Sequence, residues 1–116
     1  MEEDKIVKTS EISVKVGLNA NNLPIRMNWT APDGSIVDAE AKAFLMSIWD
    51  PKENNTMKID LWTKEMSIEE MKQFFHQTLL TMADTFERAT GETNISEDLR
   101  DYCYHFADKM NILPES

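Results

Sequence analysis

Three side chains with metal-binding groups share one face of a predicted helix near the C-terminus. Asp101, His105 and Asp108 recur at steps of four and three residues, so two carboxylates and an imidazole point the same way. Such a set could bind a divalent metal ion and support weak metal-dependent catalysis. Charges at this spacing are also common on any solvated helix, and the sequence favours this second interpretation.

Other reactive residue types lack the partners that catalysis needs. His76 has Lys72 and Leu80 at a distance of four residues, so no second metal ligand stands at helical spacing. Cys103 falls on an apolar stripe, which predicts a buried and unreactive thiol. The three glycines lie far apart, so a glycine-rich phosphate loop is excluded. We therefore expect no enzyme activity, no catalytic residues, no cofactor and no bound metal.

Charge and hydropathy narrow the class of protein. The net charge of −9 over 116 residues argues against a nucleic-acid binder and against docking on an anionic membrane surface. No apolar run approaches the ~18 residues of a membrane span, and the acidic N-terminus does not resemble a secretory signal. The single cysteine agrees with a reducing compartment. These features predict a cytoplasmic protein that does not insert into membranes.

The stretch from Met66 to Gly91 predicts one long amphipathic helix. Ser67 and Glu70 have the spacing of a capping box, and Gly91 can take the left-handed conformation that ends helices. Its apolar face repeats at steps of three and four: Ile68, Met71, Phe75, Leu79, Met82, Phe86 and Ala89. The rest of the chain must cover a face this apolar.

A second helix is expected from the N-cap Ser96 to a point just before Pro114. Its apolar face comprises Leu99, Tyr102, Cys103, Phe106, Met110 and Leu113. On the first helix, Asp84 and Arg88 have the spacing of an ion pair within one helix.

Four earlier segments have the patterns of strands. Residues 10–18 and 23–29 alternate apolar with polar around an asparagine-rich turn, which predicts a first hairpin. Residues 44–49 are almost wholly apolar, and residues 57–62 alternate again after a polar loop, which predicts a second hairpin. Between the hairpins, the composition of residues 38–42 allows a short helical turn.

The predicted fold class is α+β: a four-stranded antiparallel sheet of two hairpins, with two C-terminal helices packed on one face as an antiparallel pair. Residues 9–113 are expected to form a single domain after a frayed N-terminus, residues 1–8. The strand at 23–29 is expected at an edge, where Pro24 and Arg26 would hinder pairing with another chain.

Three stretches of the chain resemble a known family. They read WTAPDG at residues 29–34, SIWDPK at 47–52, and IDLWTKEM at 59–66, which runs into EMKQFFHQT at 70–78 and MADTFERATG at 82–91. Over residues 8–112 the chain is similar to the gliding motility-associated protein C (GldC) family of gliding bacteria. The resemblance implies a small, acidic, soluble accessory protein of surface gliding, and it carries no catalytic residues with it.

Six polar or aromatic residues are candidates for binding a partner. They are Lys58, Asp60 and Trp62 on the last strand, and Gln73, His76 and Asp84 along the edge of the long helix's apolar stripe. The strand residues share the side opposite the apolar one, which would expose a tryptophan among charges, where aromatic residues anchor protein partners. Core packing of the tryptophan and plain helix solubility are the alternative interpretations.

We therefore expect a non-enzymatic accessory protein of gliding motility, a soluble adaptor or chaperone-like module that binds a component of the gliding or secretion machinery. The alternative is a small apolar ligand-binding domain with a pocket between sheet and helices. Both a monomer and a homodimer remain open.

Overall fold

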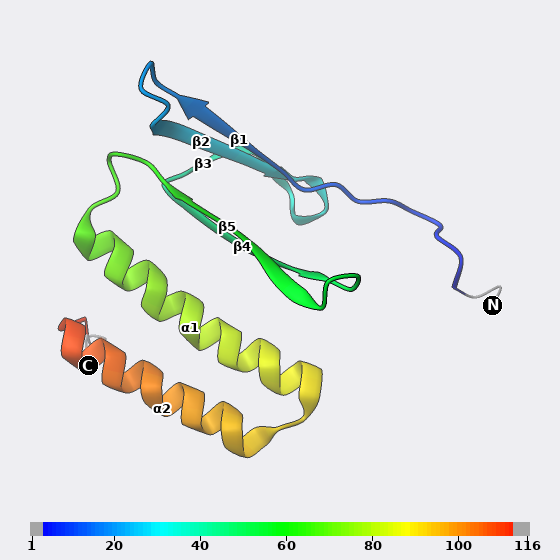
Figure 1. Cartoon of the computed structure of the whole chain (residues 1–116), viewed down its shortest axis with the longest axis vertical. Coiled ribbons are helices and arrows are strands. Elements are labelled where there is room, and N and C mark those ends of the chain that lie inside the picture. The colour runs from blue at the N-terminus through cyan, green and yellow to red at the C-terminus, as the bar shows by residue number, and fades with distance from the viewer. Residues whose placement is uncertain (1–3, 113–116) are drawn as a thin grey trace. The chain divides into compact units, whose positions relative to one another are not determined.

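The computed structural model describes residues 4–112, and the chain divides into two compact units, Met1–Met66 and Ser67–Ser116. The first unit holds β1 (Ser13–Leu18), β2 (Pro24–Ala31), the 3-10 turn η2 (Pro32–Gly34), β3 (Ile36–Ala41), β4 (Ala43–Asp50) and β5 (Asn55–Trp62). The second unit holds α1 (Ile68–Thr90) and α2 (Thr93–Met110) (Figure 1). The α+β class is confirmed. The packing of the helices on a sheet and the single domain remain predictions.

Strands β1, β2 and β3 form an antiparallel sheet in that order, with β2 in the middle. Val16, Met27 and Ala41 lie side by side across the three strands, and Met27 is fully buried. The neighbouring row is polar, because Lys15 pairs with Asn28, which pairs with Glu40. The alternation read from the first two strands therefore gives the sheet one apolar and one polar side.

Two expectations about this sheet are wrong. Residues 38–42 do not form a helical turn, because residues up to Ala41 belong to β3 and pair with β2. The strand predicted at 23–29 is central and not at an edge, because β1 and β3 occupy its two sides. Hydrogen bonding to β2 outweighs the weak helix propensity of this short segment. Pro24 stands at the first position of β2, where its missing N–H costs no ladder bond.

Strands β4 and β5 form a separate two-stranded hairpin, so the sheets have three and two strands and not four in one. The hairpin runs from the Ala43–Trp62 pair to the Asp50–Asn55 pair without a register shift. Its apolar side comprises Phe44, Met46, Ile48, Met57, Ile59 and Leu61. The two strands predicted at 44–49 and 57–62 are confirmed, each slightly longer than expected.

Helix α1 begins and ends as its sequence predicts. The Ser67 hydroxyl accepts the Glu70 N–H at 3.0 Å, and the Glu70 carboxylate accepts the Ser67 N–H at 3.0 Å, which completes the capping box. Gly91 takes the left-handed conformation with φ of 74° and donates its N–H to the Glu87 carbonyl at 2.8 Å. Local signals alone place both ends of this helix.

Helix α2 begins earlier than predicted. Glu92 is the N-cap residue, and Ser96 lies inside the helix, fully buried, with its hydroxyl donating to the Glu92 carbonyl at 2.7 Å. A serine inside a helix can bond backward in this way instead of capping. Leu113 and Pro114 lie outside the described residues. Figure 1 shows α1 and α2 as the antiparallel pair that the sequence predicts.

The capping box allows a first test. Ser67→Ala removes the acceptor for the Glu70 N–H and should lower the free energy of unfolding by about 1 kcal/mol, measured by urea unfolding followed by circular dichroism. Ser47→Ala, at an exposed position of β4, is the control and should change stability little. Equal losses in the two variants would contradict a capping role for Ser67.

Candidate functional site

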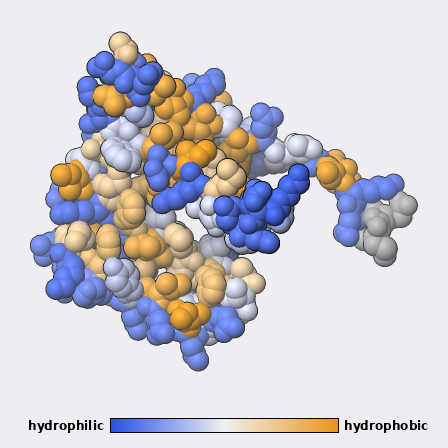
Figure 2. All heavy atoms as spheres, in the orientation of Figure 1, coloured by the Kyte–Doolittle hydropathy of each residue, from blue (hydrophilic) through white to orange (hydrophobic). Residues whose placement is uncertain are grey.

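The six predicted partner-binding residues fall in three separate places. Lys58, Asp60 and Trp62 lie on β5 in the first unit. The helix residues lie on α1 in the second unit, where Gln73 and His76 line one hollow, and Asp84 belongs to an ion-pair network farther along. Apolar side chains also reach the surface of both units, shown in orange in Figure 2.

The polar side of the β4–β5 hairpin carries two exposed tryptophans. Trp62 is 56% exposed and pairs with Ala43, whereas Trp49 is 60% exposed and pairs with Thr56. The register places both indoles on the same side and at opposite ends, about 20 Å apart for six residues of strand. Trp62 is therefore an exposed residue and not a core residue, as its strand position predicts.

Two charged residues lie between the tryptophans on this side. The Lys58 Nζ and the Asp60 Oδ2 form an ion pair at 3.6 Å, and both side chains are about half exposed. An exposed pair of this kind adds little stability, so its folding role is small. The hairpin side thus combines two aromatic rings with one paired charge of each sign.

A hollow of about 330 Å³ adjoins Trp62. Its walls comprise Leu23, Pro24, Asp60, Leu61, Trp62, Thr63 and Lys64. The Lys64 N–H donates to the Pro24 carbonyl at 3.2 Å, which joins the end of β5 to the start of β2. The buried Thr63 hydroxyl has no hydrogen-bond partner among the described residues, and no sequence pattern predicts this feature.

His76 connects the two helices through its ring. The imidazole stacks on the Phe106 ring with centroids 6.4 Å apart and planes 10° apart. Its Nε2 is buried and has no hydrogen-bond partner within residues 4–112. With Gln73, Gln77 and Leu80 it lines a hollow of about 270 Å³. His76 is therefore a boundary residue of the helix pair, and its ring contributes packing.

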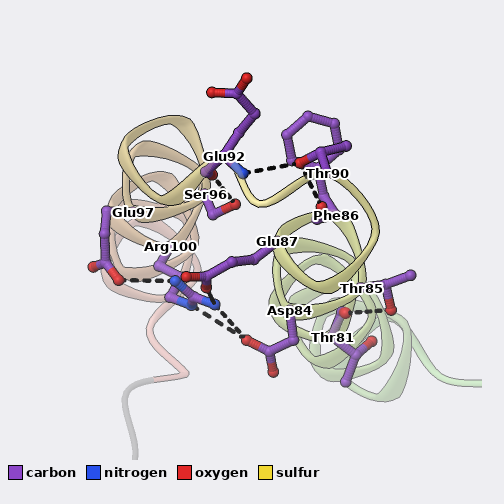
Figure 3. A network of polar contacts seen from close by, with 10 residues as sticks. All are labelled: Thr81, Asp84, Thr85, Phe86, Glu87, Thr90, Glu92, Ser96, Glu97 and Arg100. Carbon is purple, nitrogen blue, oxygen red and sulfur yellow. Dashed lines mark hydrogen bonds and ion pairs between the residues drawn. The ribbon is translucent and has the colours of Figure 1, made fainter.

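Asp84 pairs with a residue that the sequence did not single out. Arg100 of α2 donates to Asp84 at 2.8 Å and to Glu87 at 2.6 Å on α1, and to Glu97 on its own helix at 2.8 Å (Figure 3). The hydrogen bonds to Asp84 and then Glu87 raise the pKa of the Arg100 guanidinium. Arg88, the expected partner of Asp84, donates instead to the Thr85 hydroxyl at 3.3 Å.

An apolar hollow of about 450 Å³ lies within the helix pair. Its walls comprise Leu79, Met82, Ala83, Thr85, Phe86, Ala89, Leu99, Tyr102 and Cys103. Cys103 is 2% exposed, and burial raises the pKa of its thiol, which agrees with an unreactive core cysteine. Met82 and Phe86 remain partly exposed, so the apolar stripe of α1 is not wholly covered. The pocket expected between sheet and helices remains a prediction.

The helix set Asp101, His105 and Asp108 does not form a metal site. Across residues 4–112, no three carboxylate, imidazole or thiol groups are placed to hold one metal ion. The His105 ring instead lies 5.8 Å from the Tyr102 ring on the same helix. The side chains of Asp101, His105 and Asp108 are all exposed.

The Arg100 network allows a second test. Arg100→Ala leaves Asp84 and Glu87 as neighbouring unpaired carboxylates on an acidic chain, so the melting temperature should fall by a few degrees. The deficit relative to the unaltered chain should shrink in high salt, because the carboxylates are partly exposed. Arg88→Ala is the matched control and should melt nearly as the unaltered chain does. A similar loss in both variants would contradict a specific bridging role for Arg100.

A protein family described as gliding motility-associated protein GldC-like matches residues 24–112, most of the chain, and the chain belongs to this family. No curated protein and no solved structure matches the chain. Among the described residues, neither helix has the length and apolar character needed to cross a membrane.

Proposed function

From its membership of the GldC-like family, we propose that this chain is a non-enzymatic accessory protein of gliding motility that acts by binding another protein. The family description gives the process, which is gliding motility. The proposed mechanism is that of a soluble adaptor that binds a component of the gliding or secretion machinery. The net charge of −9 suits a protein partner better than nucleic acid or an anionic membrane.

The exposed tryptophans of the β4–β5 hairpin are the observation that carries this proposal. Tryptophan is enriched among the residues that dominate protein–protein binding energy, because it buries a large surface and keeps a hydrogen-bond donor. Trp49 and Trp62 present their rings on one side of a regular hairpin with the Lys58–Asp60 pair between them. A partner that covers this side would bury both rings and enclose the ion pair.

The spacing of the rings favours a protein partner over a small ligand. Two indoles about 20 Å apart span more than a small molecule covers, whereas a protein face of standard size reaches both. The hollow beside Trp62 would receive one side chain of the partner, because its volume of about 330 Å³ suits a single anchoring residue. Trp62 is therefore the proposed centre of the interface and Trp49 its outer contact.

An affinity pull-down from native extract of a gliding bacterium tests this proposal. The unaltered chain should enrich one component, and Trp62→Ala should weaken its capture by roughly 30-fold, the effect of losing an anchor of about 2 kcal/mol. Tyr104→Ala is the matched control, because Tyr104 is an aromatic residue of α2 with 60% exposure.

The two variants separate the possible outcomes. Loss of the same component with Trp62→Ala and its retention with Tyr104→Ala would support the hairpin side as the interface. Equal capture by Trp62→Ala and the unaltered chain would refute this face, and capture of no specific component would refute the adaptor role.

A further inference from the structure

The outer edge of β1 fits a second copy of this chain. We propose that two copies pair through β1 in antiparallel orientation, so that their three-stranded sheets join into one sheet across a two-fold axis. The inference is independent of the hairpin face proposed above, because β1 belongs to the other sheet of the first unit.

The edge itself is open. β1 is the first strand of the β1–β2–β3 order, and in the described part of the chain no strand pairs with its outer side. Alternate residues of an antiparallel edge strand direct their N–H and C=O groups away from the sheet. Exposed edges of this kind form hydrogen bonds with another strand unless something blocks them. Residues 4–13, which lead into this edge, are exposed throughout.

The segment before β1 has the composition of a strand but pairs with none. Ile6 is 85% exposed, Val7 is 95% exposed and Ile12 is 73% exposed. β-branched residues favour extended backbone and a packed sheet surface. The Lys8 Nζ lies 3.2 Å from the Asp33 carboxylate, and the Ser10 hydroxyl donates to that carboxylate, so the segment is attached beside η2. Pairing with a second copy would extend β1 backward into these residues.

The sequence around Ser13 is complementary to itself. With the two-fold axis at Ser13, Ile12 of each copy lies opposite Val14 of the other, and Glu11 lies opposite Lys15 of the other. One side of the joined strands then holds two apolar pairs, and the other holds two pairs of opposite charge. Directly opposed residues of these kinds stabilise antiparallel pairs, whereas opposed like charges destabilise them.

The other edge of the same sheet is less suited to pairing. In β3, Asp38 has a positive φ of 52°, and the pairing with β2 shifts register between Trp29 and Ala31. Such bulges twist an edge and interrupt its row of hydrogen-bonding groups. The irregularity in β1 falls between Gly17 and Leu18, away from the proposed axis. β1 is therefore the edge on which a regular antiparallel register can form.

Analytical ultracentrifugation of the full chain over a concentration series tests the proposal. The unaltered chain should form a dimer. Lys15→Glu should weaken it at least about tenfold, because both charge pairs become repulsive. Combining Lys15→Glu with Glu11→Lys restores opposite charges and should restore the dimer. Lys52→Glu, in the loop between β4 and β5, makes the same change of net charge and should leave the dimer intact.

Disulfide trapping tests the register. Ser13→Cys places two thiols opposite each other across the axis, within the reach of a disulfide, so mild oxidation should give a covalent dimer. Thr9→Cys is the control, since its two copies would stand about 27 Å apart along the strands. The native Cys103 is buried and should not compete.

Two results would overturn the proposal. One is a chain that stays monomeric over the whole concentration series. The other is a dimer that Lys15→Glu leaves unchanged and that Ser13→Cys does not trap, which would place the contact elsewhere. Each variant should remain folded, because the altered side chains are exposed. Circular dichroism of each variant checks this.

Discussion

A single residue, Lys42, separates β3 from β4, and this division sets the arrangement of the first unit. β3 completes one sheet on β2, whereas β4 pairs with β5 in another. The Lys42 carbonyl accepts the Thr63 N–H at 2.8 Å, and the next amide, that of Lys64, donates to the Pro24 carbonyl. Hydrogen bonds from two consecutive amides thus join the end of β5 to Lys42 and to the start of β2. Trp62 stands immediately before this junction, on backbone that is held in place.

The second unit depends on a different interaction, the meeting of two amphipathic helices. Buried Ala83, Cys103 and Ala107 are small side chains, and small residues let helix backbones approach closely. Arg100 adds a bridge between the helices and neutralises part of a local excess of carboxylates. Both units keep exposed apolar residues after these contacts are made. Surfaces of this kind are common where proteins meet partners.

Local signals predicted the parts of the structure that depend on neighbours in sequence. The ends of α1 follow from Ser67, Glu70 and Gly91, whose side-chain or backbone conformations act within one turn. The side of β5 that carries Trp62 follows from strict alternation, and the register bears it out. The sequence also showed the family, whose match covers most of the chain.

Distant contacts account for what the sequence did not predict. Residues 38–41 belong to the strand β3 because β2 lies beside them, and no local sequence pattern indicates that neighbour. Asp84 pairs with Arg100, which is 16 residues away, in preference to Arg88, because the helices meet there. The Thr63 hydroxyl is buried where the backbone after β5 meets Lys42, a contact between residues far apart in sequence. The partner itself stays a proposal, because its binding surface belongs to another protein.

The central claim is that the chain serves gliding through the tryptophan side of the β4–β5 hairpin. The most direct measurement replaces the native gene with Trp62→Ala or Tyr104→Ala and compares colony spreading of a gliding host at matched protein levels. Trp62→Ala should reduce spreading strongly, whereas Tyr104→Ala should spread like the parent. Normal spreading with Trp62→Ala at a normal protein level would contradict the claim.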